Sequence, residues 1–114
     1  MQQHIKVIRE TGVWTVRAGG AVIAESENAL ELSEGDYAPV IYFPPEDIAM
    51  ALLEKTDQKT TCAHKGEASY FSIVTKSQVI ENAAWSYETP LEGLESIANH
   101  VAFYRSDLVT IEKI

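Results

Sequence analysis

The fold and the candidate site both depend on residues 60–75, TTCAHKGEASYFSIVT. The second half, Ala68–Thr75, is rich in β-branched and aromatic residues, which predicts a strand. The first half holds the only cysteine of the chain, followed by a histidine, a lysine and a glycine. Nowhere else in the sequence do side chains that can take part in catalysis or binding stand so close together. We therefore expect a loop that carries the site and a strand directly behind it.

The strand pattern recurs along most of the chain. Further strands are expected at Ile5–Ile8, Val13–Arg17, Val22–Ser26, Ala29–Leu32, Val40–Phe43, Val79–Tyr87, His100–Tyr104 and Leu108–Ile111. Gly19 and Gly20 tolerate the positive φ of a tight hairpin turn between the second and third of these. We expect Val79–Tyr87 to form a hairpin with Ala68–Thr75, and the last two strands to pair with each other.

One helix is expected after a pair of prolines. Pro44 and Pro45 end the preceding strand, because proline has no N–H to donate to a sheet, and they suit the first turn of a helix. Apolar side chains at 48, 52 and 53 form a stripe over Glu46–Lys55, which predicts a helix. The 114 residues therefore predict one mainly β domain, 1–114, with one or two short helices.

Composition excludes several classes of protein. The net charge of −8 argues against general nucleic-acid binding, which needs clustered Lys and Arg. No apolar run approaches the roughly 20 residues that span a bilayer, and the first residues lack the apolar core of a signal peptide. A single cysteine cannot form an internal disulfide, which fits a reducing compartment. We expect a cytoplasmic protein that does not bind membranes.

The charge is unevenly spread. Residues 25–54 contain acidic residues and no Lys or Arg, and then Lys55, Lys59, His64 and Lys65 follow closely. One interpretation is an acidic, solvated face followed by an ordinary loop. The other is a local positive pocket on an acidic protein, suited to a small anion.

Cys62 and His64 are the candidate catalytic residues. Cys62 suits a nucleophile or redox thiol, because His64 is near and the Lys65 ammonium favours the thiolate. Alternatively, Cys62 is a small buried residue and His64 a surface loop residue. The sequence offers no second cysteine to resolve an oxidised one and no obvious carboxylate to orient the histidine.

Candidate ligand-binding residues lie in the same loop and on the strands beside it. Lys65 adds a cation to the N–H concavity that Gly66 allows, and together these suit a carboxylate or phosphate, although a turn glycine beside a solvated lysine is an equal alternative. The aromatic candidates are Tyr42, Tyr70, Trp85 and Tyr87. Their polar tips suit a pocket wall, whereas each ring by itself is more typical of a core.

Several segments together resemble one known family. They are Gly20–Ser26, Tyr42–Ile48, Thr61–Tyr70, Asn82–Pro90 and Val101–Tyr104. In this order they resemble the family called domain of unknown function 427, some of whose descriptions use the label nucleotidyltransferase. Two positions depart from the family pattern, which usually has proline where this chain has Ala63 and commonly arginine where it has Pro45.

The resemblance implies an antiparallel, β-tent or barrel-like architecture, similar to that of the methionine-R-sulfoxide reductases and the Mss four-type chaperones. Many of those relatives hold zinc between two Cys-x-x-Cys pairs. This chain has one cysteine and cannot build that site, so we expect neither a metal nor another cofactor. The nucleotidyltransferase label has little support, because the sequence has no paired carboxylates of the Asp-x-Asp type for magnesium.

These observations lead to several hypotheses for function. The first is a module that binds a small polar or anionic ligand in a cleft beside the Cys62–Gly66 loop. The second is an enzyme that uses Cys62 as a nucleophile or redox thiol. A protein-interaction module that uses a sheet edge or an acidic face is a third, and a nucleotidyltransferase a fourth. The sequence does not predict an oligomeric state.

Overall fold

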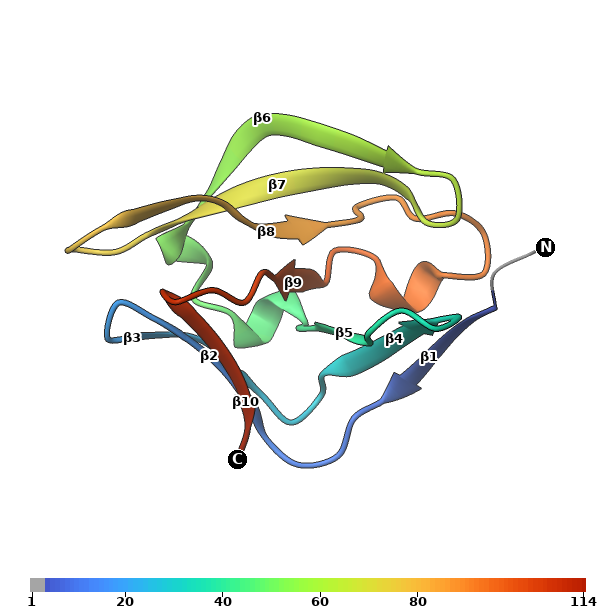
Figure 1. The fold of residues 1–114 in the computed structure, drawn as a ribbon, viewed down its shortest axis with the longest axis horizontal. Coiled ribbons are helices and arrows are strands. Elements are labelled where there is room, and N and C mark those ends of the chain that lie inside the picture. The colour runs from blue at the N-terminus through green and yellow to red at the C-terminus, as the bar shows by residue number, and fades with distance from the viewer. Residues whose placement is uncertain (1–3) are drawn as a thin grey trace.

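The chain forms ten strands and three short 3₁₀ helices in a computed structural model that describes residues 4–114 (Figure 1). The strands are β1 (Ile5–Arg9), β2 (Trp14–Ala18), β3 (Ala21–Ser26), β4 (Leu30–Glu34), β5 (Val40–Tyr42), β6 (Leu53–Cys62), β7 (Gly66–Val74), β8 (Val79–Ser86), β9 (Val101–Phe103) and β10 (Val109–Lys113). The helices are η1 (Pro45–Asp47), η2 (Met50–Leu52) and η3 (Glu95–Ile97). The predicted mainly β fold is confirmed: these strands make three antiparallel sheets, with no closed barrel in residues 4–114.

The largest sheet has the order β6-β7-β8-β9 and lies above the other two in Figure 1. β6 and β7 pair as far as Cys62 and Gly66, so that residues 63–65 alone form the turn between them. The predicted loop is thus a tight turn between two long strands. β7 and β8 form the predicted hairpin, in which Tyr70 lies opposite Trp85.

The second sheet has the order β10-β2-β3. Gly19 and Gly20, with φ of 55° and 80°, make the predicted hairpin turn between β2 and β3. The predicted pairing of the last two strands is wrong, because β10 pairs with β2 and β9 pairs with β8. The reason is burial: Val109 at the start of β10 lies opposite Ala18 and fills the core there.

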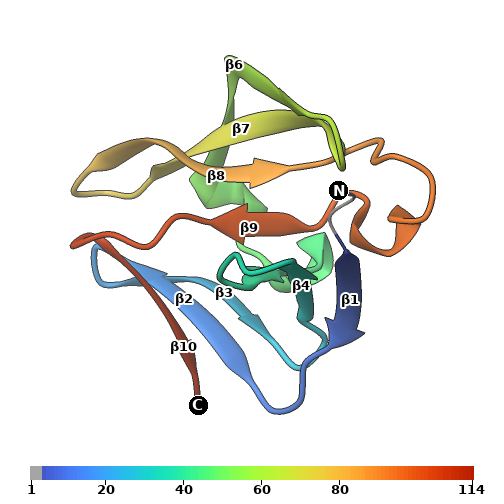
Figure 2. The same cartoon turned by 45° about the vertical axis from the view of Figure 1, so that its right-hand side comes forward.

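The third sheet has the order β1-β4-β5, and a single bridge between Phe43 and Val101 connects its end to β9. Figure 2 shows β9 between β8 and the lower strands. β4 continues to Glu34, two residues beyond the predicted end of the strand, and pairs there with Ile5 of β1. This extension matters for the site, because it brings Glu34 to the same end of the molecule as the β6–β7 turn.

Two apolar clusters hold the sheets together. The first includes the fully buried side chains Val16, Ile23, Phe43, Ile73, Val101 and Val109. The second includes Leu32, Tyr42, Ala68, Tyr70, Tyr87, Leu94 and Ile97, and Cys62 and Trp85 pack against it. Burial of one such large side chain stabilises the fold by about 1.5–3 kcal/mol. The second cluster lies beneath the β6–β7 turn and therefore supports the candidate site.

The predicted helix over Glu46–Lys55 is wrong. The chain makes two single 3₁₀ turns there, η1 and η2, and β6 already begins at Leu53. Between the turns Ile48 has an extended backbone and bridges Ala24 of β3, and the N–H of Ala49 donates to the carbonyl of Ile23 at 2.8 Å. The apolar side chains of the stripe thus cover the core from an extended segment. Their helical spacing in the sequence did not indicate a helix.

The described part of the chain is compact. Its Cα radius of gyration is 13.6 Å, close to the roughly 13 Å expected for a folded domain of about 100 residues. Within residues 4–114 no helix has the length and apolar character needed to cross a membrane.

Candidate functional site

The turn between β6 and β7 is held in one conformation by its neighbours. The Lys65 N–H donates to the Cys62 carbonyl at 3.3 Å, and the Lys65 carbonyl accepts from the Leu91 N–H at 3.0 Å. Gly66 has a φ of 113°, and a Cβ placed there would lie 3.4 Å from the Thr89 carbonyl oxygen. The backbone angle therefore favours glycine here, and the 89–91 segment passes at van der Waals distance from it.

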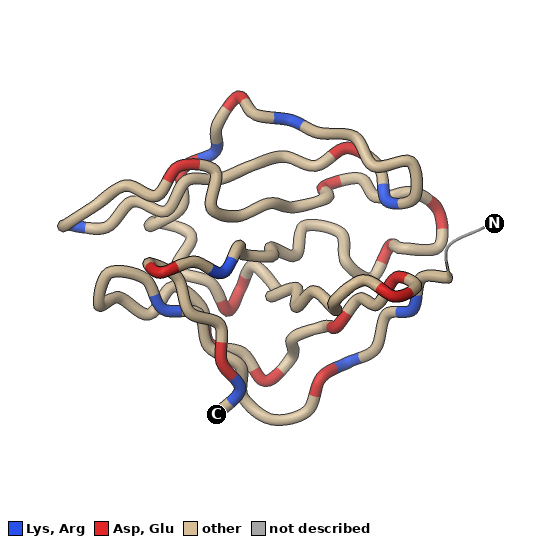
Figure 3. Tube along the Cα trace, viewed as in Figure 1, with Lys and Arg blue, Asp and Glu red and all other residues tan. Residues whose placement is uncertain are grey.

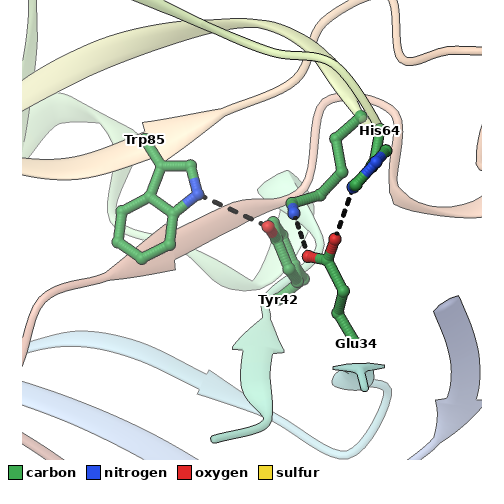
Figure 4. Close-up of polar contacts among 5 residues, drawn as sticks. Glu34, Tyr42, His64 and Trp85 are labelled. Atoms are coloured by element: carbon green, nitrogen blue, oxygen red, sulfur yellow. Dashed lines mark hydrogen bonds and ion pairs between the residues drawn. The ribbon is translucent and has the colours of Figure 1, made fainter. Parts of the chain in front are cut away.

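Glu34, from the end of β4, links two side chains of the turn (Figure 4). One carboxylate oxygen accepts a hydrogen bond from Lys65 Nζ at 2.7 Å, and the other lies 2.8 Å from His64 Nδ1. Only 11% of the Glu34 side chain is exposed. The hydrogen bond from Lys65, with that from His64, lowers the pKa of Glu34, so the carboxylate stays ionised at neutral pH.

Lys65 turns inward instead of extending into solvent. Its side chain is 14% exposed and forms an ion pair with Glu34. Burial by itself lowers the pKa of Lys65, but the hydrogen bond to Glu34 and the nearby Cys62 outweigh burial and raise it overall. Lys65 therefore remains a cation, and its charge is balanced locally by Glu34.

The hydrogen bond to Glu34 determines the chemistry of His64. An ionised carboxylate can only accept, so in neutral His64 the proton must reside on Nδ1 and point to Glu34. The other ring nitrogen, Nε2, then keeps a lone pair that can accept a proton or a hydrogen bond. His64 is 44% exposed, so this nitrogen is accessible to small molecules.

Two open hollows share Ala63 and His64 in their walls. The larger, of about 460 Å³, is lined by Glu34, Tyr37, Cys62, Ala63 and His64. The smaller, of about 330 Å³, is lined by Ile5, Ala63, His64, Leu91, Glu92, Gly93 and Leu94. We call them the Tyr37 hollow and the Leu91 hollow. Both volumes lie within the range of about 300–1,000 Å³ that is usual for small-molecule sites.

The four aromatic candidates lie beneath the turn. Tyr42, Tyr70 and Tyr87 are buried in the second apolar cluster, and burial raises the pKa of Tyr42 to about 12. Trp85 is half-buried, and its Nε1 donates to the Tyr42 hydroxyl at 3.4 Å, as Figure 4 shows. None of the four rings belongs to the walls of the two hollows. A direct ligand contact by these rings stays a prediction.

The sequence-based candidates are thus brought together only in part. Cys62 and His64 line the Tyr37 hollow, Lys65 is paired with Glu34 of its wall, and Gly66 shapes the turn. Sequence reasoning missed two residues, Glu34 and Tyr37, which stand 30 and 27 positions before His64. The one available signal was that Glu34 is an acidic residue close to the end of a predicted strand, and this does not specify a partner.

No site for a metal is present in the part of the chain from His4 onward: no three His, Cys, Asp or Glu side chains there gather closely enough to hold an ion. The polar groups of the turn form an ion network instead. It consists of one carboxylate, one ammonium group and one imidazole.

The fold and the site together define a small antiparallel β domain with an ion network and two hollows at one end. The chain belongs to the family described as domain of unknown function (DUF427), whose family model matches residues 6–113. The family that the sequence motifs resembled is therefore confirmed. A comparison with curated protein sequences gives no match.

Proposed function

We propose that this DUF427 domain binds a small polar or anionic ligand beside the Cys62–Gly66 turn. The observation that supports the proposal is the Tyr37 hollow, whose wall contains a thiol, an imidazole and a carboxylate within one small volume. Such a hollow offers hydrogen-bond donors and acceptors together with an aromatic ring, which is the usual composition of a small-molecule site.

The geometry of the site supports binding because its polar groups are already ordered. Glu34 uses both oxygens to hold Lys65 and His64, and the Leu91 N–H fixes the turn from the other side. A ligand therefore does not have to order these side chains itself, which lowers the entropic cost of binding. Preorganisation of this kind is typical of functional sites and is unnecessary for an ordinary surface turn.

The two kinds of ligand make different demands on the site. A polar neutral ligand needs only the exposed nitrogen of His64, the thiol and the Tyr37 hydroxyl. An anion needs a cation with donors to spare. Lys65 Nζ has three N–H donors, and Glu34 takes one of them, so an anion that reaches it could use another. We further propose a cytoplasmic location, which the unpaired cysteine supports.

A thermal-shift screen of neutral and anionic metabolites tests the proposal. We expect at least one compound to raise the melting temperature of the wild type, and His64→Ala and Tyr37→Ala to abolish that shift. Tyr37 is 70% exposed, so its replacement should leave the fold intact. Lys76→Ala, in the distant β7–β8 turn, is the matched surface control. If no compound stabilises the wild type, or if the hollow variants respond unchanged, the proposal is wrong.

A second candidate function is an enzyme that uses Cys62. The observation that favours it is the Glu34–His64 hydrogen bond, which supplies the orienting carboxylate that the sequence did not reveal. Cys62 and His64 line the same hollow, and Lys65 follows them in the turn.

The rate of Cys62 alkylation by iodoacetamide, followed against pH, tests this second function. A reactive thiol should be alkylated well below pH 8.5, and His64→Ala and Glu34→Gln should both shift the rate profile to higher pH. A wild-type profile centred near the value of a free thiol, about 8.5, would exclude the enzyme.

A nucleotidyltransferase is not supported by the site. Phosphoryl transfer of that kind depends on paired carboxylates that hold magnesium near a phosphate-binding loop. Each of the two hollows contains one carboxylate, Glu34 or Glu92, and Glu34 already accepts bonds from two side chains.

A further inference from the structure

Most sheet edges in the described part of the chain are covered by other segments. An open edge presents unpaired N–H and C=O groups that can pair with another chain. Phe43 and Val101 exchange hydrogen bonds of 2.8 and 2.9 Å where the third sheet meets β9. At the edge of β3, the Ala49 N–H donates to the Ile23 carbonyl at 2.8 Å. The edges at β5, β9 and β3 are therefore at least partly closed.

The edges of β10 and β6 are protected in other ways. On the outer side of β10, Val109 exchanges hydrogen bonds of 3.1 and 3.3 Å with Ser106 of the preceding loop. The Ile111 carbonyl accepts from a side chain of the same loop at 3.3 Å. On β6 the register shifts between Lys55 and Lys59. An irregular edge strand that carries lysines is a common protection against pairing with other chains.

β1 is the edge strand that stays open among residues 4–114. The bonds of an antiparallel pair come from alternate residues of each strand. The Glu10 N–H donates to the Ala29 carbonyl at 2.9 Å, so in this register the even-numbered residues of β1 face β4. The backbone groups of Ile5, Val7 and Arg9 point away from β4, and none has a partner within residues 4–114. Figure 2 shows β1 at the outer edge of the molecule, with β4 on its inner side.

The apolar side chains of β1 favour a partner strand with apolar residues. Ile5 and Val7 are half-buried against the second apolar cluster, and Ile8, on the opposite face, is 44% exposed. Side chains that lie directly opposite each other on neighbouring strands are about 4.5–5.5 Å apart. A strand beside β1 would therefore cover the exposed parts of all three side chains, and this burial would add to the main-chain hydrogen bonds.

The charge of β1 favours a partner strand with acidic residues. β1 contains two basic residues, Lys6 and Arg9, and no acidic one, although the net charge of the chain is −8. Both are exposed, and neither forms an ion pair in the part of the chain from His4 onward. Arg9 donates to Asn28 and keeps further N–H donors. Figure 3 shows basic positions along β1, at the lower right, and acidic ones on the segments beside it.

We propose that β1 binds an extended acidic peptide segment of a partner protein, which joins the third sheet as an antiparallel strand. The segment has apolar residues opposite Ile5, Val7 and Ile8. It has acidic residues opposite Lys6 and Arg9, whereas a second copy of β1 would bring cations together. Main-chain hydrogen bonds supply the affinity of such strand addition, and alternate side chains supply its specificity. The inference goes beyond the proposed function, because its main-chain contacts do not involve the β6–β7 turn.

A synthetic peptide, Thr-Glu-Val-Ile-Glu-Val-Thr, tests the inference. In the antiparallel register its first glutamate lies opposite Arg9, its isoleucine opposite Val7 and its second glutamate opposite Lys6. Binding is measured at pH 7 by amide NMR titration together with hydrogen exchange. We expect shift changes along β1. The amides of Ile5, Val7 and Arg9 should exchange about tenfold more slowly, or less, at saturating peptide, because each gains a hydrogen-bond acceptor.

Two N-methylated peptides are the matched controls. Methylation of the isoleucine nitrogen removes the N–H that faces Val7 and should abolish binding. Methylation of the second glutamate nitrogen, whose N–H faces away from β1, should leave most of the affinity. Replacement of both glutamates by lysine should weaken binding about tenfold, because like charges then lie opposite each other.

Protein variants assign the charged contacts. Lys6→Gln and Arg9→Gln should each weaken binding of the acidic peptide about twofold to fivefold, the effect expected for one cross-strand pair of opposite charge. Lys76→Gln, in the distant β7–β8 turn, is the control and should leave binding unchanged.

The contrary results are equally specific. Absence of shifts along β1 at millimolar peptide, equal binding of the lysine peptide, or equal effects of the two N-methyl groups would overturn the inference. If the amides of Ile5, Val7 and Arg9 exchange slowly without peptide and the protein sediments as a dimer, a second copy occupies the edge and the inference is wrong. None of these results changes the outcome of the metabolite screen, which tests the proposed function separately.

Discussion

Replacing Glu34 by glutamine removes one charge from the centre of the site and keeps its shape. In the wild type the carboxylate holds Lys65 at 2.7 Å and His64 at 2.8 Å. After the substitution, the Lys65 ammonium, whose side chain is 14% exposed, has only an amide oxygen as a partner. The change thus tests whether the ion network, and not merely the packing around it, stabilises this end of the molecule.

The expected cost is about 2 kcal/mol of unfolding free energy. A hydrogen bond to a charged group contributes about 1.5–3 kcal/mol, and removal of one partner from a fully buried ion pair costs about 3–5 kcal/mol. Glu34 and Lys65 keep exposures of 11% and 14%, and the glutamine oxygen still accepts one bond. Because of this partial exposure and the remaining hydrogen bond, the expected loss of unfolding free energy lies at the lower end of these ranges. It corresponds to a fall in melting temperature of about 8 °C for a domain of about 100 residues.

Urea unfolding at pH 7 measures the loss. The matched control is Glu88→Gln, because Glu88 and Lys55 also form an ion pair, at 2.8 Å, but with side-chain exposures of 45% and 47%. An exposed pair contributes about 0–1 kcal/mol, so the control should cost little. If Glu34→Gln costs no more than Glu88→Gln, the network does not stabilise the turn and the reasoning is wrong.

Three further predictions concern acid, alkali and the turn glycine. Because the native pKa of Glu34 is lowered, its stabilising effect is complete above about pH 4.3 and is lost as pH falls further. The difference in unfolding free energy between wild type and Glu34→Gln, measured with urea, should therefore shrink in acid, and a constant difference would contradict this. Because burial raises the pKa of Tyr42 to about 12, about 3 kcal/mol should be lost between about pH 10 and 12, and Tyr42→Phe should lose less in the same alkaline titration. Gly66→Ala should cost about 1–3 kcal/mol in thermal unfolding, because a φ of 113° is strained for a residue with a side chain, and Gly93→Ala, at a φ of 97°, should cost a similar amount; a negligible cost at Gly66 would contradict this reasoning.

The features predicted correctly from the sequence are local ones. Gly19 and Gly20 lie between two alternating segments, and the turn that they form needs no information from the rest of the chain. The hairpin of β7 and β8 is local in the same way. In both cases the residues that decide the structure are neighbours along the chain, so a pattern in a short window is sufficient.

The errors arise where distant segments decide the structure. The stripe at Ile48, Leu52 and Leu53 is apolar because it covers β3 and the core, and the same spacing is compatible with a helix or with two turns around an extended residue. Contact with β3, which no local pattern shows, selects the second arrangement. The pairing of β10 with β2 is another example, since the sequence of each strand is equally compatible with pairing to other strands.

The candidate site was predicted in part for the same reason. Cys62, His64 and Lys65 are adjacent, so their proximity follows from the sequence alone. Glu34 meets them only because β4 runs antiparallel to β1 and ends beneath the turn, which is a property of the sheet order. Without Glu34, Lys65 looks like a free cation suited to an anion; with it, the charge of Lys65 is balanced within the protein.

The closing of β10 onto β2 also constrains how the protein is made. Thr15 and Glu112 touch across this pair although 97 residues separate them. At translation rates of about 5–20 residues per second, β2 and β3 leave the ribosome roughly 5–20 s before their third strand exists. During that interval the hairpin exposes the unpaired edge that β10 will occupy, and the apolar face around Val16 and Ala18 lacks its cover. The nascent chain therefore spends several seconds with an unpaired strand edge, which can pair with other chains until β10 has been made.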